Sequence, residues 1–173
     1  FARRPWAWAP VPMREWLTRR LGKARLLRWI MTLYPPYLGA GVRVLHIGSD
    51  FREVKVRMGL GWYNRNYVGT QFGGSLYSMV DPFYMLMLME NLGRDYIVWD
   101  KAAAIDFISP GKGPVFAEFS IDQALLDEIR QHTASGDKYL PQLKVQIHDG
   151  SGTLVARVDK TLYVRRKLQS RQA

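Results

Sequence analysis

The sequence predicts one α+β domain in which an antiparallel sheet surrounds a single buried helix. Segments of roughly four to eight residues alternate between apolar and polar side chains, which is the period of a strand with one exposed face. Between them, a run from Met79 to Met89 is apolar on every face except where Asp81 and Pro82 interrupt it. A helix of that composition must be buried on all sides. Turns rather than helices join the later strands, which favours antiparallel pairing.

The basic residues lie mainly at the two ends of the chain. The net charge of +10 divides into +7 over residues 1–34, −1 over residues 35–164 and +4 from Arg165 onward. We therefore divide the 173 residues into a basic arm with an amphipathic helix (1–34), a folded domain (35–168) and a basic tail (169–173). The charge of the ends predicts an anionic partner, which is phospholipid, nucleic acid or the phosphates of a ligand.

The N-terminal part consists of two segments. Residues 1–12 contain three prolines and two tryptophans, which predicts an extended arm. From Met13 to Leu33, apolar residues recur at helical spacing among six Arg and Lys residues, and Tyr34-Pro35-Pro36 is predicted to end this helix. Two roles remain open for the helix. It packs its apolar face on the domain, or its Trp and Arg side chains bind an anionic membrane surface.

The folded domain is predicted to begin with an antiparallel hairpin, whose strands are Val42–Ile47 and Val54–Met58. The sequence Asp149-Gly150-Ser151-Gly152 is a strong hairpin signal between the last two strands. The other predicted elements are strands at Ile97–Ile108, Val115–Ile121, Leu143–Ile147 and Leu154–Val164, and a short helix at Leu125–His132.

Composition excludes several kinds of site. The chain has no cysteine, which rules out disulfides, thiolate nucleophiles and cysteine-based zinc sites. The three histidines, His46, His132 and His148, do not have helical metal-ligand spacing, so we expect no metal centre. The longest apolar stretch is far shorter than the ~20 residues that a bilayer requires. We expect a cytoplasmic protein whose natural start is either upstream of Phe1 or removed.

Asp81 is the first candidate for chemistry, because a lone carboxylate on an apolar helix is costly unless it has a partner or a task. It is the only acidic residue between Glu53 and Glu90. In one interpretation, Asp81 caps a helix that starts at Pro82. In the other, it is a catalytic carboxylate in a longer helix that starts near Gly74 and is kinked at Pro82.

The turn that precedes this helix is the second candidate. The backbone N–H groups of Gly73 and Gly74 are placed to bind an oxyanion, or these glycines form only a tight turn. Asn66 either orients a water or a carbonyl group, or it caps the turn. Lys112, in a Pro/Gly turn, is a phosphate contact or a solvated lysine. Ser78 has no nearby histidine to activate it, which argues against a serine hydrolase.

Asn66, the turn from Gly69 to Gly74 and Asp81 form a spaced pattern, with Asp81 seven residues after Gly74. This pattern resembles the hotdog-fold acyl-CoA thioesterases of the phenylacetyl-CoA thioesterase type, which carry Asn, a Gly-Thr-x-His-Gly-Gly turn and an Asp or Glu. The pattern from Tyr34 to Val164 also resembles an uncharacterised branch of the hotdog superfamily. The resemblance implies a hotdog fold, in which a curved antiparallel sheet wraps around one long helix and two such units pair edge to edge.

The resemblance implies a role for each residue of the pattern. The backbone N–H of Gly73 would polarise the thioester carbonyl, Asn66 would place the substrate or water, and Asp81 of the partner subunit would act as general base or nucleophile. Phe72 stands where the family usually has histidine. Either the reaction runs on Asp81 and Asn66, or the site binds acyl-CoA without hydrolysing it. The implied substrate contacts are Thr70, Phe72, Gly74, Ser78 and Lys112.

Together these observations favour an acyl-CoA thioesterase or thioesterase-like hydrolase, in which a carboxylate assists the attack of water on a thioester. The resemblance implies a coenzyme A thioester as substrate, no further cofactor, and a homodimer or dimer of dimers. Two other classes remain. One is a non-catalytic acyl-CoA-binding or regulatory protein. The other is a basic protein that binds nucleic acid through its ends, which ranks lowest because the ends lack a recognisable binding motif.

Overall fold

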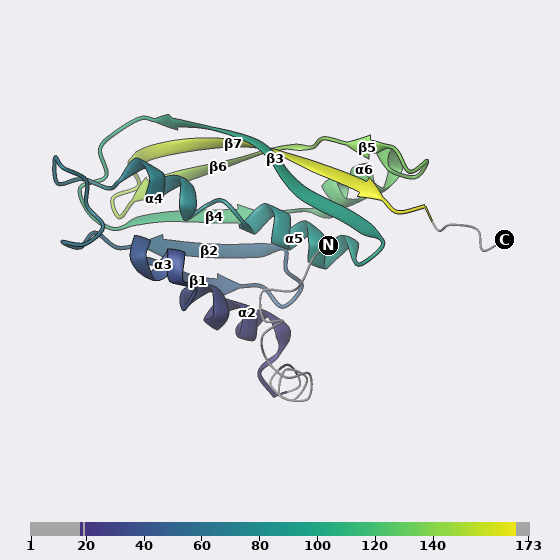
Figure 1. Ribbon diagram of the computed structural model, residues 1–173, viewed down its shortest axis with the longest axis horizontal. Coiled ribbons are helices and arrows are strands. Elements are labelled where there is room, and N and C mark those ends of the chain that lie inside the picture. The colour runs from purple at the N-terminus through teal and green to yellow at the C-terminus, as the bar shows by residue number, and fades with distance from the viewer. Residues whose placement is uncertain (1–17, 19, 169–173) are drawn as a thin grey trace.

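The computed structural model describes residue 18 and residues 20–168. Its curved antiparallel sheet faces a helical layer made by α4 and α5 (Figure 1), which confirms the predicted α+β class. The helices are α2 (Lys23–Thr32), α3 (Pro35–Ala40), α4 (Gly73–Ser78), α5 (Phe83–Leu92) and α6 (Gln123–His132). The strands are β1 (Val42–Ile47), β2 (Glu53–Met58), β3 (Tyr96–Phe107), β4 (Val115–Ser120), β5 (Lys138–Tyr139), β6 (Gln142–Asp149) and β7 (Leu154–Arg166).

The strands follow the order β1-β2-β4-β6-β7-β3, and the two-residue strand β5 also pairs with β7. Every pairing is antiparallel. The predicted β1–β2 hairpin is confirmed, with Val42 opposite Met58. The predicted β6–β7 hairpin is confirmed as well, because the Asp149 carboxylate accepts the N–H groups of Ser151 and Thr153 and so closes the turn. The two edges of the sheet are therefore β1 and β3.

Helix α5 packs on the sheet through aromatic side chains. The rings of Phe83 and Tyr84 lie 5.1 Å and 5.2 Å from the ring of Phe119 on β4, measured between centroids. The Tyr84 hydroxyl donates to the Lys144 carbonyl on β6 at 2.7 Å. Burial of each such ring stabilises the fold by roughly 1.5–3 kcal/mol. The expectation of burial on all sides is only partly right, because Met85, Leu86 and Met89 stay half-buried in a single chain.

The predicted central helix is split at Asp81-Pro82. Helix α4 begins at Gly73, as the longer-helix interpretation expected, and a turn over residues 79–82 separates it from α5. The capping interpretation of Asp81 is wrong. The cap residue of α5 is Pro82, and no side chain makes a capping hydrogen bond there. Asp81 does not cap α5 because Tyr77 and Lys160 already donate hydrogen bonds to its carboxylate.

The N-terminal helix differs from its prediction at two points. Gly22 has φ 77° and ψ 149°, a conformation open only to glycine, so the predicted helix is broken at Gly22 and α2 starts at Lys23. Pro35 and Pro36 occupy the first turn of α3, where proline is favoured, so they begin a helix as well as ending one. The arm (1–12), residues 13–17 and the tail (169–173) lie outside the described residues.

Candidate functional site

A pocket of about 380 Å³ opens where the turn before α4 meets the end of β3. Its volume is in the range of small-molecule sites. One wall comes from the central stretch and the other from the segment that follows β3. The lining residues are Asn66, Thr70, Gln71, Gly73 and Leu76 on one side and Phe107, Ile108, Ser109, Pro110 and Gly111 on the other. The pocket thus brings together three of the predicted site residues, Asn66, Thr70 and Gly73.

The turn over residues 66–71 is held by Asn66. Its side-chain oxygen accepts the N–H groups of Val68 (3.1 Å) and Thr70 (2.9 Å), and its amide donates to the Thr70 hydroxyl at 2.8 Å. Through these hydrogen bonds Asn66 caps the turn, which is one of the two roles that the sequence left open for it. Asn66 lines the pocket at the same time, so it sets the shape of the wall that Thr70 also lines.

Gln71 ties this turn to the opposite wall. Its backbone N–H donates to the Gly111 carbonyl at 2.9 Å, and its side-chain amide donates to the carbonyls of Gly113 (3.0 Å) and Gly59 (3.2 Å). The side chain is buried, and its oxygen has no hydrogen-bond partner among the described residues. Gln71 therefore fixes the width of the pocket.

Gly73 brings the backbone at the start of α4 close to Phe107, another residue of the pocket lining. A Cβ atom at Gly73 would lie 2.9 Å from the Phe107 ring, so a larger residue there would force that ring to shift from the start of α4. The first N–H groups of a helix have no acceptor within it, which leaves the Gly73 amide available to a ligand. Phe72 is 55% exposed, and a Cβ atom at Gly74 would meet its ring.

Asp81 lies outside this pocket, in a cluster with Tyr77, Asp100 and Lys160. The Tyr77 hydroxyl donates to Asp81 Oδ1 at 2.7 Å. Lys160 Nζ lies 3.1 Å from the same oxygen and 2.9 Å from Asp100 Oδ1, and it also donates to the Asp81 backbone carbonyl. The contact with Asp100 is an ion pair without hydrogen-bond alignment. The Lys160 side chain is 0% exposed and that of Asp81 is 45% exposed. One buried ammonium thus holds two carboxylates.

Burial and charge alter the acidity of this cluster. Burial raises the pKa of the Asp100 carboxyl, and the neighbouring Lys160 ammonium opposes the rise. Burial and the hydrogen bond to Asp81 raise the pKa of the Tyr77 hydroxyl, so it remains a donor to the carboxylate at neutral pH. Asp81 therefore keeps a fixed orientation while nearly half of its side chain stays open to water.

Four of the five predicted substrate contacts, Phe72 among them, do not line the pocket. Lys112 is exposed, directly after Gly111 of the pocket wall. Gly74 is exposed beside Phe72. Ser78 is the last residue of α4 and precedes Asp81 by three residues. In one chain the structure therefore does not bring Asp81 to Asn66 and Gly73.

Sequence reasoning missed Lys160, although the sequence contains a signal for it. In β7, residues 156, 158, 160, 162 and 164 all face inward, and Lys160 is the one charged residue among Ala156, Val158, Leu162 and Val164. A lysine on the apolar face of an alternating strand requires a buried partner. The partners lie 60 and 79 residues away, so the spacing of the sequence does not identify them.

Comparisons with known proteins agree on the fold. The sequence matches the family described as "Domain of unknown function (DUF4442)" over residues 22–164. No curated protein is similar to it in sequence. A Pseudomonas aeruginosa protein described as a probable thioesterase of unknown function, PA5026, has a similar structure at 18% identity, covering 91% of this chain and 97% of that chain with a TM-score of 0.65.

Two further structures are similar. The thioesterase HI1161 of Haemophilus influenzae is 13% identical, covers 84% of this chain and 92% of its own, and has a TM-score of 0.60. A mutant of the phenylacetic acid degradation protein PaaI of Thermus thermophilus is 21% identical, with coverages of 78% and 99% and a TM-score of 0.53. At these identities the likeness establishes the fold, which is the predicted hotdog fold.

Within residues 18 and 20–168, none of the helices is both long and apolar enough to cross a membrane. The same residues contain no group of three or more His, Asp or Glu side chains that is arranged to hold a metal ion.

Proposed function

From the premise that the chain belongs to the family described as "Domain of unknown function (DUF4442)" and has a hotdog fold, we propose that it hydrolyses acyl-CoA thioesters. The observation that carries the proposal is the pocket at the start of α4. It combines a close backbone approach at Gly73 with the hydroxyl of Thr70 and an apolar wall at Phe107 and Ile108. An apolar wall suits an acyl chain, and bare N–H groups suit a thioester oxygen.

The proposed reaction uses water as the nucleophile. The Gly73 amide donates to the thioester carbonyl oxygen and stabilises the charge that develops there. A water molecule loses a proton to the Asp81 carboxylate as its oxygen bonds to the carbonyl carbon. The C–S bond then breaks, and the sulfur of coenzyme A leaves with the electron pair and takes the proton from Asp81. The products are a carboxylic acid and a free thiol. Exposed Lys112, beside the pocket, is proposed to meet the phosphates of coenzyme A.

A panel of acyl-CoA thioesters of increasing chain length tests the proposal. We expect the purified protein to release free thiol from at least one of them, measured with a thiol-reactive dye. An acyl-CoA that raises the melting temperature without thiol release would instead support a non-catalytic binding protein. The exposed ring of Phe72, in place of histidine, is the observation that favours this second candidate.

Because Asp81 and Gly73 do not meet in one chain, we propose that two chains build each site. Asp100, which contacts the Asp81 cluster, and Phe107, which lines the pocket, lie on the same edge strand, β3. They are seven residues apart, or roughly 23 Å along an extended strand. Antiparallel pairing of two β3 strands about a two-fold axis near Ala103 and Ala104 sets Asp100 of one chain opposite Phe107 of the other.

The two edges of the sheet differ in a way that supports this pairing. Helix α2 covers the β1 edge, because Arg28 donates to the Leu45 carbonyl at 3.1 Å and the Val44 N–H donates to the Thr32 hydroxyl at 3.2 Å. In the described part of the chain, β3 pairs only with β7, and its residues 101–104 are exposed. An open strand edge is a template for a second strand.

We expect light scattering to give at least twice the 20.0 kDa mass of one chain. Ala103→Glu places two like charges close to the proposed two-fold axis and is expected to shift the protein toward monomers at micromolar concentration. Gln146→Glu, at an exposed position of the interior strand β6, adds the same charge and should leave the mass unchanged. A wild-type protein that remains monomeric would refute both the pairing and the two-chain site.

A further inference from the structure

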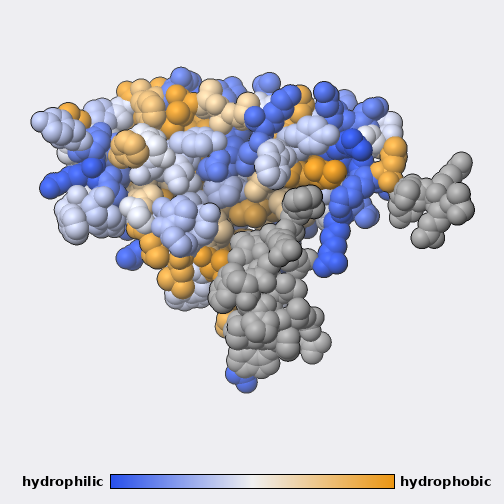
Figure 2. Space-filling view, viewed as in Figure 1, coloured by the Kyte–Doolittle hydropathy of each residue, from blue (hydrophilic) through white to orange (hydrophobic). Residues whose placement is uncertain are grey.

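The outer face of α2 and α3 carries large apolar side chains that no part of the described chain covers. Arg25 and Trp29 lie one turn apart on the exposed side of α2, and Leu33 follows them as the C-cap residue. Leu21, just before the break at Gly22, is exposed as well. Tyr34, which precedes α3, and Leu38, within α3, are also exposed. Trp29 is 54% exposed. We call this set, Leu21, Arg25, Trp29, Leu33, Tyr34 and Leu38, the α2–α3 surface. Hydrophobic atoms reach the lower edge of the molecule in Figure 2, at the position of α3 in Figure 1.

The opposite face of α2 holds the helix firmly on the domain. Ala24, Leu27 and Met31 belong to the same buried core as the sheet. Hydrogen bonds to β1 and an ion pair between Lys23 and Glu90 add to this attachment. The exposed apolar side chains therefore do not serve the core. They present a rigid surface, so little conformational entropy is lost when that surface docks.

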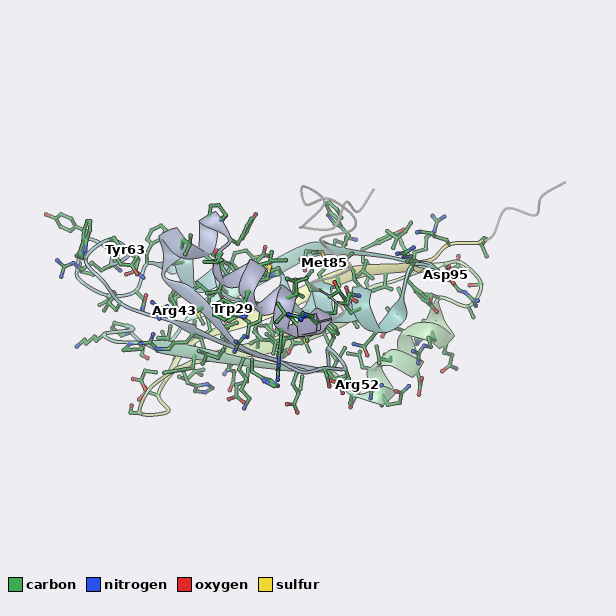
Figure 3. All side chains as sticks on the ribbon, turned by 90° about the horizontal axis from the view of Figure 1, so that it is seen from below. Trp29, Arg43, Arg52, Tyr63, Met85 and Asp95 are labelled. Carbon is green, nitrogen blue, oxygen red and sulfur yellow. The ribbon has the colours of Figure 1, made fainter. Side chains whose placement is uncertain are left out.

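The charge around the surface favours an anionic occupant. Between Glu15 and Asp50 the sequence has six Arg and Lys residues and no acid, and Glu90 pairs with one of the six, Lys23. Arg25 and Arg43 are exposed there, and Arg28 lies 5.3 Å from the Trp29 ring. Figure 3 views the molecule from this side, with Trp29 of α2 and Arg43 of β1 labelled. A second copy docking through the same surface would set these cations against each other, which disfavours it.

The combination of apolar and basic side chains on the α2–α3 surface favours a lipid surface over other anionic partners. A nucleic acid contacts the arginines but offers little to Leu33 or Leu38, because phosphate contacts dominate its affinity. An anionic membrane interface accepts both, since Trp and Tyr settle at headgroup depth, Leu enters the acyl region and Arg meets the phosphates. We propose that the α2–α3 surface docks this protein peripherally on anionic membranes.

Vesicle co-sedimentation of the full chain tests the docking surface. We expect binding to phosphatidylcholine vesicles that contain phosphatidylglycerol, weak binding to phosphatidylcholine alone, and weaker binding as salt rises. One basic residue near such a surface changes affinity about five-fold, so Arg25→Glu should cost roughly 25-fold. Trp29→Ala should cost about ten-fold or more, through lost apolar burial. Both variants should melt as the wild type does.

Lys138→Glu is the matched control. It changes the net charge as Arg25→Glu does, but Lys138 lies exposed on β5, far from α2 in Figure 1, and should leave binding unchanged. The proposal is overturned if the wild type does not bind anionic vesicles, binds neutral ones equally, or loses as much affinity with Lys138→Glu as with Arg25→Glu. Two further outcomes also overturn it. In the first, Arg25→Glu and Trp29→Ala both keep wild-type binding to anionic vesicles. In the second, Trp29→Ala binds duplex DNA as well as the wild type does, and only Arg25→Glu loses that binding. None of these outcomes depends on thioesterase activity.

Discussion

Replacing Lys160 with Met is expected to lower the free energy of unfolding by about 3 kcal/mol at pH 7, the lower end of the range for losing one partner of a buried ion pair. Met keeps most of the volume but leaves the carboxylates of Asp81 and Asp100 without the ammonium that lies 3.1 Å and 2.9 Å from them. Water reaches the half-exposed Asp81 and offsets part of the loss. For a domain of this size, the melting temperature should fall by roughly 6–12 °C.

Lys144→Met provides the control on the neighbouring strand. Lys144 and Asp159 are both well exposed and lie 3.8 Å apart, so losing this pair should cost at most about 1 kcal/mol. Adding Asp81→Asn and Asp100→Asn to Lys160→Met should restore part of the stability, because no buried charge then lacks a partner. Equal melting temperatures for wild type and Lys160→Met would show that the cluster contributes nothing to folding.

The loss in Lys160→Met is expected to depend on pH. Burial raises the pKa of Asp100 in the folded protein. A carboxyl with a raised folded pKa contributes stability below its unfolded pKa and loses it as pH rises through the folded pKa. Removing Lys160 removes the charge that opposes the rise, so the variant should lose more stability than the wild type in the pH window that begins at the ordinary Asp pKa of about 4. Denaturant titrations across this window should show the gap widening with pH, and a constant gap would contradict the assignment to Asp100.

Asp81→Asn is expected to lower thioesterase turnover by ~10²–10⁴-fold, the usual cost of losing a positioned general base. Asn at position 81 still offers an oxygen to Tyr77 and Lys160, so the hydrogen bonds at 2.7 Å and 3.1 Å can persist. It has no carboxylate to take a proton. The variant should therefore stay folded and dimeric, which melting and light scattering would check.

Tyr77→Phe separates orientation from chemistry. It removes the 2.7 Å hydrogen bond to Asp81 but keeps the carboxylate and the contact with Lys160. We expect a smaller loss of turnover than for Asp81→Asn. Wild-type turnover in Asp81→Asn would mean that the carboxylate is not the base, and Asp81 would then serve only the ion-pair cluster.

The parts of the fold that depend on local pattern could be predicted from the sequence. Alternation identified β2 and β4, and the Asp149-Gly150 turn identified the last hairpin, because strand period and turn chemistry are set by neighbouring residues. The break at Gly22 and helix α3 could not be predicted so directly. An isolated glycine is tolerated inside many helices, and a Pro-Pro pair can end one helix and begin the next.

The candidate site was predictable on one side only. The turn at Asn66 and Gly73 is contiguous in the sequence, and the structure places both in the pocket. The environment of Asp81 depends on Lys160, which is 79 residues away, so the sequence left a local cap open as an alternative explanation. The role of Asp81 depends on its contact with a distant strand. The spacing of residues within the central stretch does not predict that contact.

Subunit complementation tests the central claim, a thioesterase site shared by two chains, most directly. Asp81→Asn removes the base, and Gly73→Val removes the close approach, since its Cβ would lie 2.9 Å from the Phe107 ring. Each variant alone is expected to be inactive while remaining folded. In a mixed dimer, one site combines Gly73 of the first variant with Asp81 of the second, so coexpression should restore thiol release from acyl-CoA. Mixed dimers that form but remain as inactive as either parent would contradict the shared site.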